Sequence, residues 1–145
     1  MWNRRWLLAV GALTIATLLV VATPGLASDE VPLKGSATST FQSYDPDTQT
    51  AHHTIAGTST HLGLLSGDAY VRFVFDPAPR PVSAEVHMVA ANGDELVLDQ
   101  VMATMTYTIL GGTGRFEGAT GSGSFTAAGS GNVTLVWDGT IDFKD

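Results

Sequence analysis

The sequence predicts an all-β protein in which residues 28–145 form a single eight-stranded antiparallel β-barrel. Three observations favour this fold. Eight segments rich in β-branched or alternating apolar residues follow one another between turn signals, without a helical period. Half of the 16 glycines fall between Gly111 and Gly131, where strands would bend sharply. The chain has no cysteine, so a domain of this size depends on its core alone, which a closed sheet can provide.

Residues 1–27 have the pattern of a signal peptide. Arg4 and Arg5 precede an uncharged, largely apolar run over residues 7–22, and small residues up to Ala27 predict cleavage before Ser28. The alternative is a retained membrane anchor, but the apolar run is shorter than the ~20 residues of a membrane span. We therefore expect a secreted protein, extracellular or periplasmic, with no stable membrane insertion after cleavage.

The composition after residue 27 excludes several classes of function. All 14 acidic residues lie there, against five basic ones, which gives a formal charge of −9. Such an acidic surface disfavours nucleic acid and anionic lipid as partners. The absence of cysteine rules out thiol catalysis and thiolate metal sites. No sequence motif indicates a cofactor.

Four strands are predicted in the first half of this domain, over residues 31–44, 48–60, 68–75 and 82–91. Pro46, flanked by two aspartates, marks the first turn. Residues 61–67 are expected to form a loop. Three prolines in residues 76–81 must interrupt the sheet, because each removes a backbone donor.

Four more strands are predicted over residues 95–101, 103–110, 120–128 and 133–143. Asn92-Gly93 predicts a hairpin with a type I′ turn before the first of them. Leu96 and Leu98 are expected on the core side of that strand. In the last strand one face is expected to carry the apolar side chains of Val133, Leu135, Trp137, Ile141 and Phe143.

A glycine-dense corner joins the sixth and seventh predicted strands. Gly111 to Gly114 are expected to reverse the chain, and Phe116 then returns as a lone large apolar residue between two charges. The glycines do not have the G-x-G-x-x-G spacing of a dinucleotide loop, and a β-like segment follows them in place of a helix. A structural corner is therefore favoured over a phosphate site.

The stretch over residues 108–121, Thr-Ile-Leu-Gly-Gly-Thr-Gly-Arg-Phe-Glu-Gly-Ala-Thr-Gly, resembles the Gly-Gly-Thr/Ser-Gly-x-Phe corner of the allene oxide cyclase and dirigent barrels. It resembles still more the corner of uncharacterised secreted bacterial proteins. The resemblance implies an eight-stranded antiparallel barrel, often oligomeric, with a cavity at one end. The catalytic residues of the plant proteins match no identifiable positions here, so none is transferred.

Few residues are candidates for a site. His52 and His53 are adjacent on a strand and point to opposite faces, and the four histidines lack metal-ligand spacing, so no metal site is predicted. Either His53 with Ile55 or His52 with Thr54 could line a cavity, and His53 is taken as the candidate. Tyr70 and Arg72 share a strand face: if it faces the lumen, Arg72 would await an anionic ligand or pair with Glu85, and if it faces outward they are surface residues.

The sequence supports two functional hypotheses and no catalytic residue. The favoured one is a secreted, non-catalytic module that binds a small apolar or amphipathic ligand or self-associates, as a homo-oligomer for example. The alternative, implied by the resemblance, is a cyclase- or isomerase-like enzyme acting on a small apolar substrate in the lumen. In a third hypothesis the protein is structural and has neither a ligand site nor an active site, because its interior is filled. The side chains that could fill it are Phe116, Phe125, Trp137 and Phe143.

Overall fold

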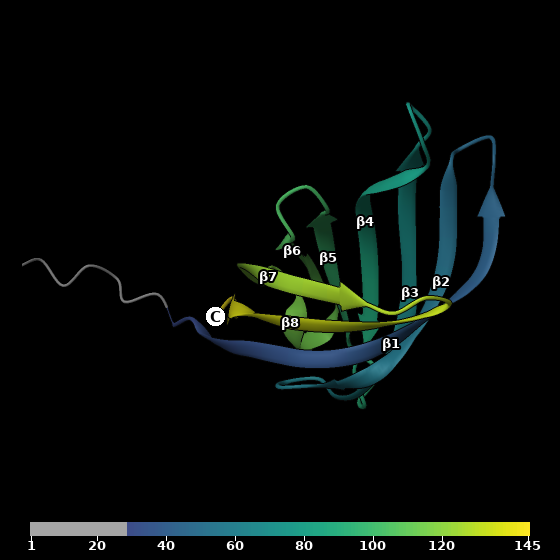
Figure 1. The fold of residues 1–145 in the computed structure, drawn as a ribbon. Helices are drawn as coiled ribbons and strands as arrows, with labels where there is room; N and C mark the ends of the chain where they lie inside the picture. Colours follow the sequence, from purple (N-terminus) through teal and green to yellow (C-terminus); the bar gives the residue numbers. More distant parts are fainter. Residues whose placement is uncertain (1–28) are drawn as a thin grey trace, which may run out of the picture.

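The computed structural model describes residues 29–145, and these form one closed antiparallel barrel with the strand order β1 to β8 (Figure 1). The predicted fold is confirmed. The predicted signal peptide, residues 1–27, lies outside the described residues. The strands are β1 (Val31–Asp45), β2 (Thr50–Ser59), β3 (Gly63–Val74), β4 (Arg80–Val89), β5 (Glu95–Val101), β6 (Thr106–Gly112), β7 (Thr120–Ala128) and β8 (Asn132–Asp142).

Strand β1 closes the barrel because it pairs with β2 on one side and, over residues 31–40, with β8 on the other. Gly35, for example, lies opposite Ser59 on one side and Trp137 on the other. Each strand from β2 to β7 pairs with its two sequence neighbours, and β8 pairs with β7 and β1. The described sheet therefore closes on itself, with residues 41–45 of β1 paired to β2 alone and β6 paired to β7 at three positions.

The two ends of the barrel differ. The end that carries the β1–β2, β3–β4, β5–β6 and β7–β8 connections is called here the open end. Its β1–β2 hairpin and β3–β4 loop extend beyond the other strands (Figure 1). The opposite, closed end carries the β2–β3 and β4–β5 turns and the glycine-dense corner between β6 and β7.

Large apolar side chains fill the closed end. Leu33, Leu96 and Ile141 come from strands around the barrel and are fully buried, and Phe116 is buried with them from the corner. Phe116 sits on a short 3-10 turn, Gly114–Phe116, whose backbone is closed by the Phe116 amide donating to the Thr113 carbonyl at 3.0 Å. Phe116, the lone aromatic of the corner, therefore fills the barrel interior at this end and acts as its plug.

The corner is held to the neighbouring β4–β5 turn by hydrogen bonds. The Thr113 amide donates to the Glu95 carbonyl at 2.8 Å, and the Glu95 amide donates to the Thr113 hydroxyl at 2.9 Å. The Arg115 amide donates to a carboxylate oxygen of Asp94 at 3.2 Å. Gly114 has a φ of 57° and lies against the same carboxylate, so a side chain there would be strained and would collide with it.

Three local predictions were wrong. Strand β3 begins at Gly63, because the expected loop over residues 61–67 is mostly strand and pairs with the end of β2. Strand β6 begins at Thr106 and continues through Gly111 and Gly112, which pair with β5 across a bulge, so the chain reverses only at the 3-10 turn. The Asn92-Gly93 hairpin is present, but only Gly93 has a positive φ, which a type I′ turn would require at both residues.

A pair of glycines makes room for a large side chain beside the core. Gly123 and Gly139 lie opposite each other on β7 and β8, and a Cβ atom at either position would collide with the hydroxyl of Tyr107. Tyr107 itself is buried on β6. The small residues of this sheet region thus permit close packing of an aromatic side chain against the backbone.

Candidate functional site

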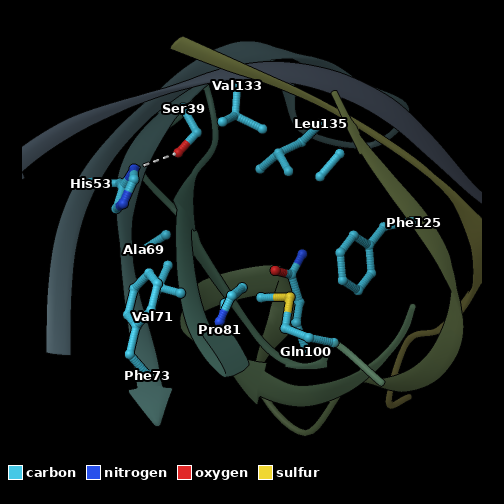
Figure 2. A pocket seen from close by; sticks show the side chains of 12 residues that line it. Ser39, His53, Ala69, Val71, Phe73, Pro81, Gln100, Phe125, Val133 and Leu135 are labelled. Atoms are coloured by element: carbon cyan, nitrogen blue, oxygen red, sulfur yellow. Dashed lines mark hydrogen bonds between the residues drawn. The ribbon is translucent and has the colours of Figure 1, made fainter. Parts of the chain in front are cut away.

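A cavity of about 210 Å³ occupies the barrel interior toward the open end. Figure 2 shows its side chains arranged in a ring around an unfilled centre. Its walls come from seven strands, all but β6, and from the turn after β5, and most are apolar: Ser39, His53, Ala69, Val71, Phe73, Pro81, Gln100, Met102, Phe125, Ala127, Val133 and Leu135. This lumen cavity is the candidate site.

Side-chain alternation explains why the lumen is hollow at this end. Small side chains face inward here, such as Ala69 on β3 and Ala127 on β7. Of the aromatics expected to compete for the interior, Phe116 is at the closed end, and Phe125 alone lines the lumen cavity. The barrel is therefore packed at one end and hollow at the other.

Three polar side chains interrupt the apolar wall. The Ser39 hydroxyl lies 3.1 Å from Nδ1 of His53, and this is the hydrogen bond drawn in Figure 2. Gln100 is only 6% exposed, and its amide points into the cavity without a hydrogen bond to the other residues shown there (Figure 2). A primary amide both donates and accepts, so it can bind a ligand hydroxyl, carbonyl or amine.

The environment of His53 keeps its imidazole neutral near pH 7. Burial in the wall, and secondly the neighbouring His52, lower the pKa of His53 below its ordinary value. Nδ1 is engaged by Ser39, so the tautomer follows the direction of that hydrogen bond. The edge of Phe41 packs on this ring, with centroids 5.6 Å apart. His53 thus presents an uncharged polar edge to the lumen.

The lumen cavity leads into a second hollow at the rim of the open end, which we call the mouth. The two share His53 and Phe73. The mouth has a volume of about 380 Å³ and is lined by Phe41, Tyr44, Ala51, His53, Phe73, Phe75 and Pro79. It is thus built from the β1–β2 hairpin and the loop after β3, the two connections that project farthest in Figure 1.

The other three predicted site residues lie on the outer face. Tyr70, Arg72 and Glu85 are exposed, and none of them lines the lumen cavity or the mouth. Of the two orientations left open by the sequence, the structure shows the outward one. Glu85 bonds to His87, and no ion pair of the described residues joins it to Arg72. Tyr70 instead borders a third hollow of about 370 Å³ on the outer side of the β1–β2 hairpin, whose other lining residues are Ser43, Tyr44, Asp45, Thr48, Thr50 and His52.

Tyr70 belongs to a connected row of side chains across the outside of β2, β3 and β4. Its ring stacks on His52 at 5.2 Å and meets His87 edge-on at 6.1 Å. His52 Nε2 lies 2.6 Å from an Asp68 carboxylate oxygen, and the two nitrogens of His87 contact Glu85 and Glu95 at 2.6 and 3.0 Å. Burial alone would lower the pKa of His87, but the bonds to these two carboxylates outweigh it and raise that pKa.

Sequence reasoning found His53 and missed Ser39 and Gln100. Both residues could have been found from the alternation of inward and outward side chains along their strands. Gln100 continues the alternation of Leu96 and Leu98 on β5, so it shares their inward face. Ser39 likewise follows Ala37 on the inner face of β1. A polar residue in phase with core residues is the pattern that marks a lumen contact in a barrel.

Two further searches concern only residues 29–145. No group of three or more histidine, cysteine, aspartate or glutamate side chains in this range is arranged to hold a metal ion. No helix in this range has the length and apolar character needed to cross a membrane.

The comparison with known proteins yields a structural relative. No protein-family model matches the chain, and no curated protein matches it. Among solved structures, the pterocarpan synthase dirigent protein GePTS1 is similar, with a TM-score of 0.53 and 12% sequence identity over 80% of this chain and 86% of that one. At this identity the likeness concerns the fold, and it agrees with the dirigent-like barrel that the glycine-dense corner implied.

Proposed function

We propose that this protein is an exported, non-catalytic binding module that holds a small apolar or amphipathic molecule in its lumen. One observation carries the proposal: the buried amide of Gln100 faces an apolar cavity of about 210 Å³. A purely structural barrel would gain stability from filling that space with larger side chains and from an apolar residue in place of Gln100. Sites for small ligands combine apolar walls with few polar groups in this way.

The alternative is a cyclase- or isomerase-like enzyme. It is supported by the name of the structural relative, a pterocarpan synthase, and by the Ser39–His53 pair at the lumen wall. A neutral imidazole held by a hydroxyl could transfer a proton to or from a bound molecule. The binding module is favoured because the lumen presents no second titratable side chain beside His53 among the residues that line it.

Export and self-association are further parts of the proposal. Export rests on the signal-like composition of residues 1–27. Self-association rests on apolar side chains that the outer face leaves exposed, of which Leu64 at 74% and Leu110 at 58% are the most accessible. A closed sheet has most of its backbone groups paired, so such side chains would supply the contact surface.

The test is native mass spectrometry of the full chain produced in an exporting host. We expect a non-covalent mass excess that disappears on denaturation. The matched variants are Val133→Phe, which places a ring in the lumen, and Val136→Phe, which places it on the outer face of the same strand. The first should lose the bound mass and the second should keep it. Bare wild-type protein that also takes up no apolar compound would overturn the proposal.

A further inference from the structure

We infer that the ligand is an uncharged, elongated molecule that places a polar group in the lumen cavity and a ring system in the mouth. This inference rests on the proposed function and gives the chemical class of its ligand. It follows from the size of the lumen cavity, from the aromatic side chains of the mouth, and from the charge of the residues that line both.

The lumen cavity alone is too small for more than one ring-sized group. A cavity of about 150 Å³ accommodates a benzene molecule, and the lumen cavity measures about 210 Å³. A larger ligand must therefore extend past His53 and Phe73, the residues that the lumen cavity shares with the mouth. The mouth, at about 380 Å³, offers more room than the lumen does.

The mouth exposes aromatic rings that have little to cover them. Phe41 is 52% exposed and Phe75 is 47% exposed, which is unusual for phenylalanine on a small acidic domain. Tyr44, on β1, meets Phe73 and Phe75 edge-on, with centroids 6.4 and 6.1 Å apart. These mutual contacts fix the rings at angles that leave faces available for stacking. A ring of the ligand would cover them.

Charge selects against ionic ligands. Among residues 29–145, the side chains that line the two cavities include no aspartate, glutamate, lysine or arginine, and His53 is the one that titrates near neutral pH. Its lowered pKa keeps it neutral there. An ionised group in the lumen would lose its hydration without gaining a partner of opposite charge. The formal charge of −9 on residues 28–145 adds a general repulsion of anions.

The polar group of the ligand is expected at Gln100. This amide offers a donor and an acceptor inside an otherwise apolar wall, and the Ser39–His53 pair lies across the same cavity (Figure 2). A hydroxyl, a carbonyl or the N–H of an arylamine satisfies such groups without carrying charge. An amphipathic alcohol, phenol, ketone or arylamine with a ring at its far end therefore fits both compartments.

A pair of fluorescent probes tests the inference directly. N-phenyl-1-naphthylamine is neutral and has two ring systems joined by one N–H, and 8-anilinonaphthalene-1-sulfonate has the same skeleton with a sulfonate added. Both brighten in apolar surroundings. We expect the neutral probe to bind the wild-type protein. The sulfonate should bind with an affinity at least about tenfold lower, because its charge would be buried without a partner.

Three variants locate the probe. Phe75→Ala should weaken binding of the neutral probe about three- to tenfold, the range expected for one aromatic contact. Val133→Phe should abolish that binding by filling the lumen. Tyr70→Ala removes an exposed aromatic that borders neither the lumen cavity nor the mouth, so it should leave binding unchanged.

The outcomes separate this inference from the proposed function. Equal binding of both probes, each lost in Val133→Phe, would overturn the charge selection and leave a lumen site intact. Binding that is lost in Val133→Phe but unaffected by Phe75→Ala would overturn the role of the mouth. Failure of the neutral probe to bind at all, together with bare protein in the mass spectrum, would overturn the proposed function itself.

Discussion

Tyr107 shows how tightly single side chains are constrained on the packed side of the barrel. Its hydroxyl is buried against Gly123 and Gly139 and has no hydrogen-bond partner among residues 29–145. Nε1 of Trp137 is buried without a partner in the same range. Burial, and secondly the negative charge of Asp138, raises the pKa of Tyr107 to about 12. The ring thus contributes packing, and its hydroxyl carries a desolvation cost.

This gives a prediction for Tyr107→Phe. The unfolded chain ionises this phenol near pH 10 and the folded chain near 12, so the folded state holds its proton more tightly. The associated stability is complete below about pH 10 and is lost as the pH rises toward 12. Urea unfolding should show a smaller alkaline loss of stability in the variant, and at neutral pH the variant should equal or exceed the wild type by up to about 1 kcal/mol.

A clear loss of stability for Tyr107→Phe at neutral pH would contradict this reading, because it would show that the hydroxyl is hydrogen-bonded in solution. Gly139→Ala supplies the complementary control. Its Cβ atom would collide with the Ser122 carbonyl as well as with the Tyr107 hydroxyl. The alanine should therefore remain destabilising even in combination with Tyr107→Phe.

At the scale of elements, the corner between β6 and β7 closes one end of the barrel through one residue. Phe116 is fully buried, and its ring lies 5.9 Å from that of Phe143. The Arg115 guanidinium lies over both rings, 5.2 and 5.4 Å from their centroids. Arg115 contributes a partly exposed cation–π contact, whereas Phe116 fills the volume between the strand ends.

Phe116→Ala is therefore expected to destabilise the barrel by about 3–5 kcal/mol, the cost of removing a buried phenylalanine. Arg115→Ala should cost no more than about 1 kcal/mol, because a partly exposed cation–π contact is weak. Equilibrium urea unfolding of both variants gives the comparison. Similar small losses for the two variants would show that the corner is not a plug.

The same corner shows what sequence can predict at this scale. The alternation of β-branched and apolar residues predicted all eight strands, and the glycines predicted that a corner would follow the sixth. The place of the reversal was wrong, because β6 continues past an extra residue, Leu110, which bulges against β5, and Gly111 beside it adopts a φ of 118°. The start of β3 was wrong for a similar reason: its first residues are paired through contacts with β2 that local sequence does not contain.

For the whole molecule, the uneven filling of the interior links stability to binding. Small inward side chains such as Ala69 leave the lumen unfilled at the open end, whereas the closed end is packed. Val133→Phe should therefore raise the free energy of unfolding of the unliganded protein by about 0.5–2 kcal/mol while it removes binding of the neutral probe. Thermal unfolding and probe titration of the same sample measure both effects. A variant that is destabilised and still binds would contradict this trade-off.

The candidate site was less predictable than the fold. The inward position of a residue depends on the register of its strand, and a shift by one residue exchanges the two faces. His53 could be named because it alternates with an apolar neighbour, and the outward face of Tyr70 became clear only from the closed sheet. The mouth could not be predicted, because it joins a hairpin and a loop that are more than 20 positions apart in the sequence.

Closure of the barrel through β1 and β8 has a consequence for how the chain reaches its native state. Strand β1 cannot pair on its second side until β8, the last strand, has been synthesised. A nascent chain that does not yet include β8 therefore has two unpaired edge strands, and these can pair with other chains. Because the closing contact joins strands separated by nearly the whole domain, it is also the contact with the largest loss of chain entropy. Conditions that delay the formation of β8 should thus favour aggregation over folding, even though the completed barrel is closed.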